Sequence, residues 1–309
     1  MKQAIERNGT GAAMKMADLL DMDYSLLGVF NRMGLSLGFG EASVEEVCRE
    51  ADVDADTFLL ICHMYMTDGY RPTREELQRT DLNNILEYLR KSHDYYTGVM
   101  LPETENAIGE FVKPCEEKQK AVILRFMEEY KEELLAHFRY EEETVFPYVE
   151  HMLNSEDEGP FTIDEYEQNH SNVEEKLQDL KNLVMMYMPA QCRVQDANKA
   201  LFYLFNFQQD LAKHTLIEDD ILVPMVLRME EVIAAARPEG EELSTREKEI
   251  LVSVARGMLN KEIADQYNIS IYTVITHRKN ITRKTGIKTV AGLTVYALLN
   301  NLIDINTVE

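Results

Sequence analysis

Four amphipathic segments in the middle of the chain each place one histidine among apolar residues that recur every three or four positions. They run from Leu82 to Met100, from Phe126 to Tyr148, from Ile163 to Val184 and from Leu204 to Met225, with a break expected near Pro102. Such a stripe is typical of the inward face of a helix in a four-helix bundle. Because an unpaired polar side chain is costly to bury, four histidines on these inward faces need a common explanation.

The four histidines repeat at fixed intervals. His93 and His137 are 44 residues apart, as are His170 and His214, and the two pairs are offset by 77 residues. The second histidine of each pair also starts the pattern His-x3-Glu-x5-Pro. The middle region is therefore interpreted as two copies of a helical hairpin related by a pseudo-twofold axis, each of which supplies two histidines and one glutamate.

A His-x3-Glu pair places both side chains on one helix face, within reach of a shared ion. Six such ligands are too many for one tetrahedral zinc and contain too few oxygens for calcium. Two metal ions bridged by Glu141 and Glu218 fit the set better and leave positions for a small ligand such as O2 or NO. Imidazole and carboxylate without thiolate favour two iron ions, with manganese or zinc as chemical competitors. The predicted metal ligands are His93, His137, Glu141, His170, His214 and Glu218.

On this pattern residues 79–235 resemble a hemerythrin-like domain, and the order of the motifs is most similar to the di-iron proteins of iron–sulfur cluster repair. The resemblance implies four terminal histidines and two bridging glutamates at the positions above. Oxygen-carrying hemerythrins have a fifth histidine where this chain has Glu174, which disfavours reversible O2 carriage and favours redox or NO chemistry. Asp219 falls at the position of their bridging aspartate and is a second candidate ligand, ranked below Glu218.

Residues 1–78 are expected to form a small domain of short helices. The segment Met33–Gly40, followed by Ser43–Cys48, resembles the small domain that precedes the di-iron bundle in repair proteins. That family carries two adjacent cysteines where this chain has Gly38 and Phe39. We therefore expect the associated thiol chemistry to be lost and a structural or dimerisation role to be favoured.

A polar linker is expected at residues 236–242. The pattern of residues 243–309 after it predicts four short helices. Ser244 or Thr245 is placed to cap the first helix and Gly257 to end it, and Ser270 is placed to cap the third, which ends at Gly286. The second and third helices are joined by a short turn, and the third is rich in Lys and Arg. This arrangement is the helix-turn-helix of DNA-binding proteins.

The C-terminal segment is similar over its whole length to a LuxR/GerE-type DNA-binding domain, most clearly at Asn260–Ala264 and at Thr273 and Val274. The resemblance implies a third helix in the major groove of double-stranded DNA, with Ile275 among the base readers and basic side chains on phosphates. The predicted DNA contacts are Lys261, Thr273, Ile275, Thr276, Arg278, Lys279, Arg283 and Lys284.

The fourth helix of this segment presents an apolar stripe suited to pairing two modules on a two-fold DNA site. A homodimer on DNA is therefore expected. The stripe consists of Val290, Leu293, Ala297 and Asn301.

The formal net charge of −23 is unevenly distributed. Between Arg256 and Lys288 there are seven basic residues and two acidic ones, whereas the rest of the chain is strongly acidic. This balance argues against an RNA-coating or membrane-surface protein and permits a dedicated nucleic-acid module. The chain also lacks a candidate membrane span, a signal-peptide pattern and a CxxC spacing among its four cysteines, which predicts a cytoplasmic protein with ordinary buried thiols.

Together these patterns predict an all-α chain with a small N-terminal helical domain, an up-down four-helix bundle, a linker and a four-helix DNA-binding domain. The predicted function is transcription regulation by a di-iron centre that senses O2, NO, or redox or iron state, with no catalytic residues. The runner-up is a di-iron protein of iron–sulfur cluster repair or iron donation that uses DNA binding for autoregulation. An iron store or iron-level sensor is a third interpretation.

Overall fold

The fold is all-α, as predicted from the sequence, and the described part of the chain contains one isolated β-bridge, between Lys15 and Ser43. None of the described helices is both long and apolar enough to cross a membrane. The chain divides into two compact units between Leu227 and Arg228, and each is described separately below. The structure is a computed structural model that describes residues 11–154, 163, 166, 173–186, 191–236, 243–267 and 269–303.

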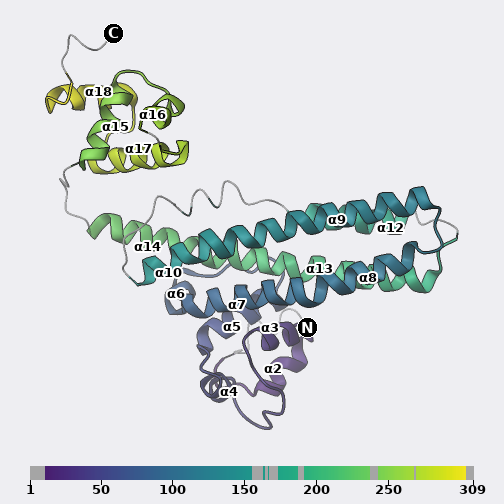
Figure 1. The fold of residues 1–309 in the computed structure, drawn as a ribbon. Helices are drawn as coiled ribbons and strands as arrows, with labels where there is room; N and C mark the ends of the chain where they lie inside the picture. The colour runs from purple at the N-terminus through teal and green to yellow at the C-terminus, as the bar shows by residue number, and fades with distance from the viewer. Residues whose placement is uncertain are drawn as a thin grey trace. The chain divides into compact units, whose positions relative to one another are not determined.

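The first unit begins with a group of short helices packed along one side of the long helices (Figure 1). Phe30 and Phe58 pack edge to face in its core, with ring centroids 5.5 Å apart. Gly38 has a φ of 96°, a conformation that a cysteine would adopt only with strain, in keeping with the expected loss of the family's paired thiols. The helices are α2 (Met16–Met22), α3 (Leu26–Arg32), α4 (Val44–Glu50), α5 (Ala55–Met66) and α6 (Arg74–Arg79).

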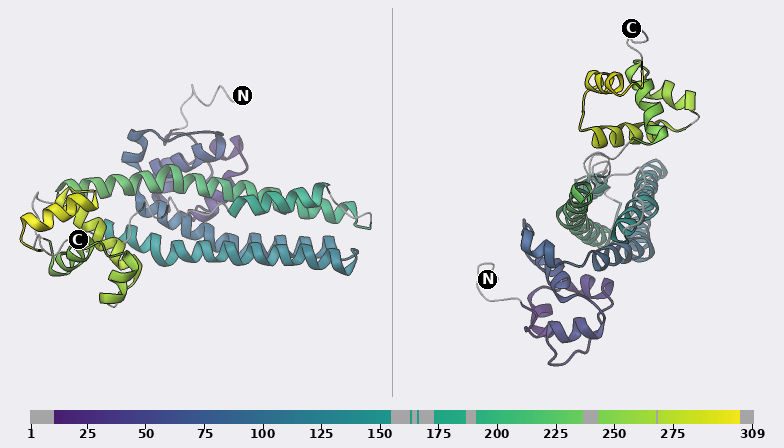
Figure 2. Two further views of the ribbon diagram at one scale, coloured as in Figure 1. Left: turned by 90° about the horizontal axis from the view of Figure 1, so that it is seen from above. Right: turned by 90° about the vertical axis from the view of Figure 1, so that its left-hand side faces the viewer.

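The long helices of the same unit lie side by side and enclose an apolar core that includes Tyr130, Leu134, Leu177, Leu204 and Phe207 (Figures 1 and 2). Three runs continue without a break through a π-helical segment, η1, η2 or η3. The elements in chain order are α7 (Leu82–Tyr95), η1 (Tyr96–Met100), α8 (Leu101–Val112), α9 (Glu117–Tyr140), η2 (Glu141–Val145), α10 (Phe146–Leu153), α12 (Val173–Met186), α13 (Val194–Ile217), η3 (Glu218–Leu222) and the first residues of α14 (Val223–Ala236), which continues into the second unit.

Each π-helical segment is followed, two residues after its end, by a proline: Pro102, Pro147 and Pro224. In η2 the backbone N–H of Phe146 donates to the carbonyl of Glu141, five residues earlier, and equivalent bonds close η1 and η3. A proline in an α-helix lacks a donor and its ring clashes with the carbonyl four residues before it, and the wider π turn relieves both problems. The break predicted near Pro102 was therefore wrong, because the helix continues through the proline.

Arg32 of α3 connects the N-terminal helices to the bundle. Its buried guanidinium donates to the hydroxyls of Tyr65 and Tyr88, at 2.8 and 3.0 Å, and to Asp210 of α13 at 3.1 Å. Nearby, the ammonium of Lys213 donates to a backbone carbonyl of α5 at 2.8 Å. A buried charge is tolerated only when it is paired and hydrogen-bonded, as Arg32 is, so these contacts give the N-terminal helices a structural role against α13.

The second unit contains a compact module whose helix ends follow the sequence prediction. Ser244 and Glu247 form a capping box at the start of its first helix, Ser270 caps the third, and Gly286 ends the third in the left-handed conformation. Its core includes Ile250, Leu251, Val254, Ile263, Val274 and Ile281. The helices are α15 (Thr245–Ala255), α16 (Asn260–Tyr267), α17 (Ile271–Thr285) and α18 (Val290–Leu299).

The apolar stripe predicted on α18 was wrong at two of its four positions. Leu293 and Ala297 pack into the core of their own module and are not available to a second copy. The exposed apolar side chains of α18 are instead Val290, Val295 and Leu299. The error arose because α18 is apolar on both faces, so the sequence period alone did not identify the inward one.

Candidate functional site

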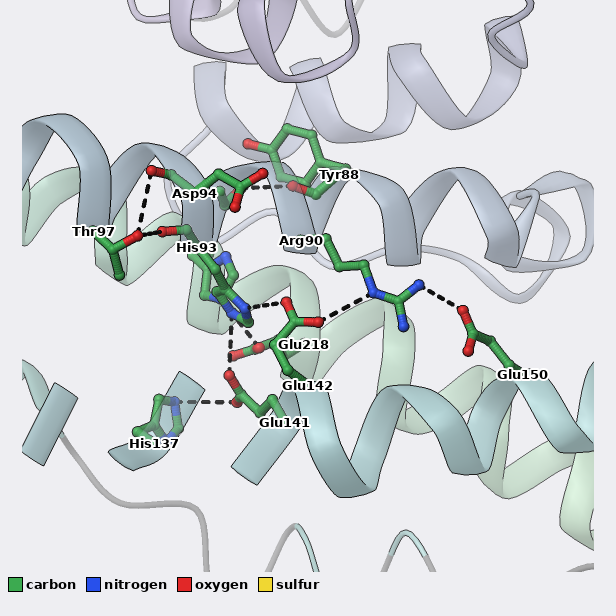
Figure 3. Close-up of polar contacts among 12 residues, drawn as sticks. Tyr88, Arg90, His93, Asp94, Thr97, His137, Glu141, Glu142, Glu150 and Glu218 are labelled. Carbon is green, nitrogen blue, oxygen red and sulfur yellow. Dashed lines mark hydrogen bonds and ion pairs between the residues drawn. The ribbon is translucent and has the colours of Figure 1, made fainter. Parts of the chain in front are cut away.

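The candidate metal ligands of the bundle converge at one buried point (Figure 3). His93 comes from α7, His214 from the end of α13, and Glu141 and Glu218 are the first residues of η2 and η3. One ligand atom from each lies within 4.8 Å of the others. The Nε2 atom of His93 is 3.2 Å from a carboxylate oxygen of Glu141 and 3.2 Å from Nε2 of His214. Four side chains from three separate helical runs thus face one centre.

His137 extends this cluster, because its Nε2 atom lies 3.1 Å from the other carboxylate oxygen of Glu141. His170 lies outside the described residues, as does the side chain of Glu174. Five of the six side chains proposed from the sequence therefore lie together, and their assignment as metal ligands remains a prediction.

The cluster has the donor chemistry of a metal site. Glu141 and Glu218 are both 0% exposed, and two carboxylates so close together in the interior are costly unless protons or cations balance them. Burial disfavours the charged form of His93, but hydrogen bonds to Glu141 and Glu142 outweigh burial and raise its pKa to about 9. Imidazole nitrogens and carboxylate oxygens without sulfur suit iron, manganese or zinc. The residues present therefore fit the metal that the sequence predicts.

A chain of ionic contacts, which the sequence pattern does not reveal, orients His93. The Nδ1 atom of His93 lies 2.9 Å from Glu142, which accepts from Arg90 at 3.2 Å, and Arg90 also donates to Glu150 at 2.5 Å (Figure 3). The ring of Phe138 stacks on His93 with centroids 4.2 Å apart. Bonding of Nδ1 to a carboxylate leaves Nε2 directed at the cluster, which is the usual arrangement around a ligating histidine.

Tyr166 is a second neighbour of the cluster that the sequence did not single out. Its hydroxyl donates to Glu141 at 2.7 Å, and burial together with the nearby carboxylates of Glu218 and Glu141 holds its pKa well above the ordinary value. Tyr166 is therefore a neutral donor to a carboxylate of the site. Asp219, the alternative ligand, is exposed, whereas Glu218 is buried, which supports the ranking of Glu218 above Asp219.

The basic face of the C-terminal module is formed mainly by α17. Four of the predicted DNA contacts, Ile275, Arg278, Lys279 and Arg283, line one surface hollow. Asn260, which was not predicted as a contact, also lines it and accepts from Arg278 at 2.7 Å. The hollow thus brings base-reading and phosphate-binding candidates onto one side of the helix.

The other predicted DNA contacts lie elsewhere in the module. Lys261 is exposed on α16, and Thr273 belongs to the cap of α17, where its backbone N–H donates to Ser270 at 3.0 Å. Thr276 is half-buried on α17. Lys284 donates to the buried carboxylate of Glu247 at 2.9 Å, so its ammonium has a role in the module's own structure. Contact of these residues with DNA stays a prediction.

Comparison with known proteins matches two segments of the chain to family models. Residues 84–226 match the family model "Hemerythrin HHE cation binding domain", and residues 241–297 match "Bacterial regulatory proteins, luxR family". The transcriptional regulatory protein MctR of Rhizobium johnstonii is 46% identical over 61 residues, which are 20% of this chain and 28% of MctR. The response regulator protein VraR of Staphylococcus aureus is 39% identical over 90 residues, which are 29% of this chain and 41% of VraR. No solved structure matches the chain significantly.

The aligned segments span less than half the length of these curated relatives. The first family match contains the buried histidine and glutamate cluster, and the second contains the hollow along α17. The chain therefore joins a hemerythrin HHE cation binding domain to a domain of the luxR family of bacterial regulatory proteins.

Proposed function

We propose that this chain is a DNA-binding transcription regulator whose bundle holds two iron ions and responds to O2, NO, or cellular redox or iron state. The observation that carries the proposal is the convergence of His93, His137, Glu141, His214 and Glu218 in a chain that also has a basic helix-turn-helix module. Bound iron would supply a change of oxidation state and an affinity for small gas ligands. The regulated DNA is double-stranded, and the module is proposed to bind it as a homodimer.

A surface hollow reaches the edge of the cluster at His93. The hollow has a volume of about 500 Å³ and is lined by His93, Phe138 and Glu142, among others. His93 therefore lies between this hollow and the buried carboxylates. Glu141 and Glu218 on the far side of His93 are fully buried, which excludes bulk water and larger molecules. The full burial of both glutamates favours a small ligand over an organic metabolite at the cluster itself.

The proposal predicts that DNA affinity depends on the state of the metal. We expect the affinity of the full chain for its operator, found by footprinting, to differ at least about tenfold between two of four states: metal-free, ferrous, ferrous with NO, and oxidised by O2. Metal analysis and optical spectra of protein purified without oxygen would identify the bound ion in each state. A difference only between metal-free and ferrous protein would assign an iron-level sensor, and equal affinity in all four states would remove sensing while leaving DNA binding.

Removal of one basic side chain from the hollow should weaken binding to all DNA sequences by a similar factor. For Arg283→Ala we expect the affinity to fall and the slope of log affinity against log salt to decrease by about one, because one phosphate contact is lost. Lys248→Ala, which removes a positive charge from α15 instead, is the matched control and should leave the slope unchanged. Fluorescence anisotropy with labelled DNA at several salt concentrations measures both. Equal slopes for Arg283→Ala and the unaltered protein would contradict the assignment of this face.

A further inference from the structure

Two thiols face each other at the end of the bundle that is remote from the histidine and glutamate cluster. Cys115 lies in the turn between α8 and α9, and Cys192 lies in the turn that leads into α13. Their sulfur atoms are 3.0 Å apart, and the residues are 8% and 7% exposed. Each cysteine precedes by two residues a long helix that later carries a His-x3-Glu pair.

The internal repeat of the chain accounts for this pairing. Cys115 and Cys192 are 77 residues apart, the interval that also separates His137 from His214, and each cysteine precedes its histidine by 22 residues. At a rise of about 1.5 Å per residue, the thiols lie roughly 30 Å along the helices from the cluster. The pseudo-twofold relation that brings the histidines together at one end of the bundle therefore brings the cysteines together at the other end.

We propose that Cys115 and Cys192 are a redox-sensitive pair that forms a reversible intramolecular disulfide and joins the two helical hairpins covalently. A disulfide needs its sulfur atoms about 2.05 Å apart, so the two sulfur atoms have to approach by about 1 Å. Turns adjust by this distance more readily than helix interiors do, because neither cysteine is held in a helical hydrogen-bond ladder.

The chemistry requires a two-electron oxidant, for which hydrogen peroxide is the simplest class. One thiol sulfur attacks a peroxide oxygen and the O–O bond breaks, which gives a sulfenic acid and one water. The second thiol sulfur then attacks the sulfenic sulfur, the S–S bond forms, and the S–O bond breaks with release of a second water. Both sulfurs are oxidised, the peroxide is reduced, and the two thiol protons leave in the waters. An external thiol reverses the reaction by exchange.

The raised thiol pKa in this pair indicates that its oxidation by peroxide is slow, unlike that of a catalytic cysteine. Burial, together with a hydrogen bond to Cys115, raises the pKa of the Cys192 thiol to about 12, so little thiolate is present at neutral pH. This differs from the low pKa of a peroxidase or oxidoreductase cysteine. The pair is therefore suited to sustained oxidant exposure, and it acts independently of the metal and of the proposed gas response.

Peptide mapping of the full chain tests the pair directly. The protein is treated with hydrogen peroxide in the presence of a metal chelator, blocked with N-ethylmaleimide in denaturant, and digested for mass spectrometry. We expect a cross-linked peptide that joins Cys115 to Cys192, and at least a tenfold loss of labelling at both, reversed by dithiothreitol. Cys48 and Cys62, which are buried within α4 and α5, should remain fully labelled.

Thermal unfolding provides the second measurement. Because the link closes a loop of 77 residues, oxidation should raise the unfolding temperature of the bundle by at least about 5 °C. Cys115→Ala and Cys192→Ala should each abolish the rise, and the matched control Cys48→Ala should retain it. Unchanged labelling of both thiols after peroxide, separate sulfinic acids at each, or cross-links between different chains would overturn the proposal, even if the metal-dependent function is correct.

Discussion

The substitution Glu218→Gln is expected to abolish metal binding at the buried cluster while changing the stability of the metal-free chain by less than about 1 kcal/mol. Glu218 is fully buried, and its carboxylate lies 3.2 Å from Nε2 of His214. The amide keeps the shape and one oxygen but loses the negative charge that a cation requires. In the unaltered chain, metal at about a thousand times its dissociation constant adds roughly 4 kcal/mol, or an increase in unfolding temperature of about 10 °C. Calorimetry with and without metal should show that this increase is lost.

The neighbouring residue supplies the matched control for this experiment. Asp219→Asn removes the same charge one position later in the chain, from a side chain that is exposed. We expect Asp219→Asn to retain the metal content and the metal-dependent increase in unfolding temperature. If Asp219→Asn lost the metal and Glu218→Gln kept it, the carboxylate assignment at this helix would have to be exchanged.

The second large effect is expected from Glu247→Ala, which should unfold the DNA-binding module. Glu247 is 4% exposed, caps α15 through the capping box with Ser244, and accepts from Lys284 of α17. Its removal deletes the cap of α15 and takes a carboxylate from the partly buried ammonium of Lys284, which together cost about 2–5 kcal/mol, comparable with the stability of a small domain. Hydrogen exchange of the α15 and α17 amides in the full chain would report the loss. DNA binding should disappear with it.

An adjacent glutamate distinguishes this effect from a general loss of charge. Glu249 pairs with Arg246 at 2.8 Å on the exposed side of α15, so Glu249→Ala should cost no more than about 0.5 kcal/mol. Comparable exchange rates in the two variants would show that the contact between the buried Glu247 and Lys284 is not what stabilises the module.

The same pair predicts how acid affects the module. Burial alone would raise the pKa of Glu247, but hydrogen bonds from Lys284 and Ser244 and the lysine charge hold it below the ordinary value. Glu247 therefore stabilises the folded module above the ordinary glutamate pKa of about 4.3, and this contribution is lost as pH falls through the lower folded value. The protection of the α15 and α17 amides in the unaltered chain, taken relative to the intrinsic exchange rate at each pH, should accordingly fall below about pH 4 toward the level of Glu247→Ala.

Much of the fold and of the candidate metal site could be predicted because both depend on sequence periodicity. The intervals of 44 and 77 residues fix which helices carry the histidines, and the step of four from His137 to Glu141 fixes a shared helix face. Helix caps such as Ser244 and Ser270 depend on local chemistry and were equally accessible. Features of this kind require no knowledge of how distant segments meet.

The features that could not be predicted depend on distant contacts or on departures from the ideal helix. Glu142 and Tyr166 reach His93 and Glu141 only because particular helices meet with a particular rotation, which the spacing of residues does not encode. Each π turn inserts one extra residue into the helix, so the apolar residues after it no longer follow the three- and four-residue spacing of an α-helix. A pattern based on that spacing therefore predicts a break in the helix at this point. The proline that ends each His-x3-Glu-x5-Pro pattern is the one sequence signal of these π turns, because each proline lies just after a π-helical segment.

The position of Arg32 determines how far the chain can be truncated from its N-terminus without loss of folding. Asp210, which accepts from Arg32, precedes His214 by one turn of α13, so the arginine of the first helices stabilises the helix next to the histidine and glutamate cluster. A truncated chain that begins after α6 would lose the guanidinium and leave Tyr88 and Asp210 without their shared donor. The short helices and the bundle are therefore expected to fold as one piece, and a chain trimmed to the family-matched residues 84–226 should fold poorly.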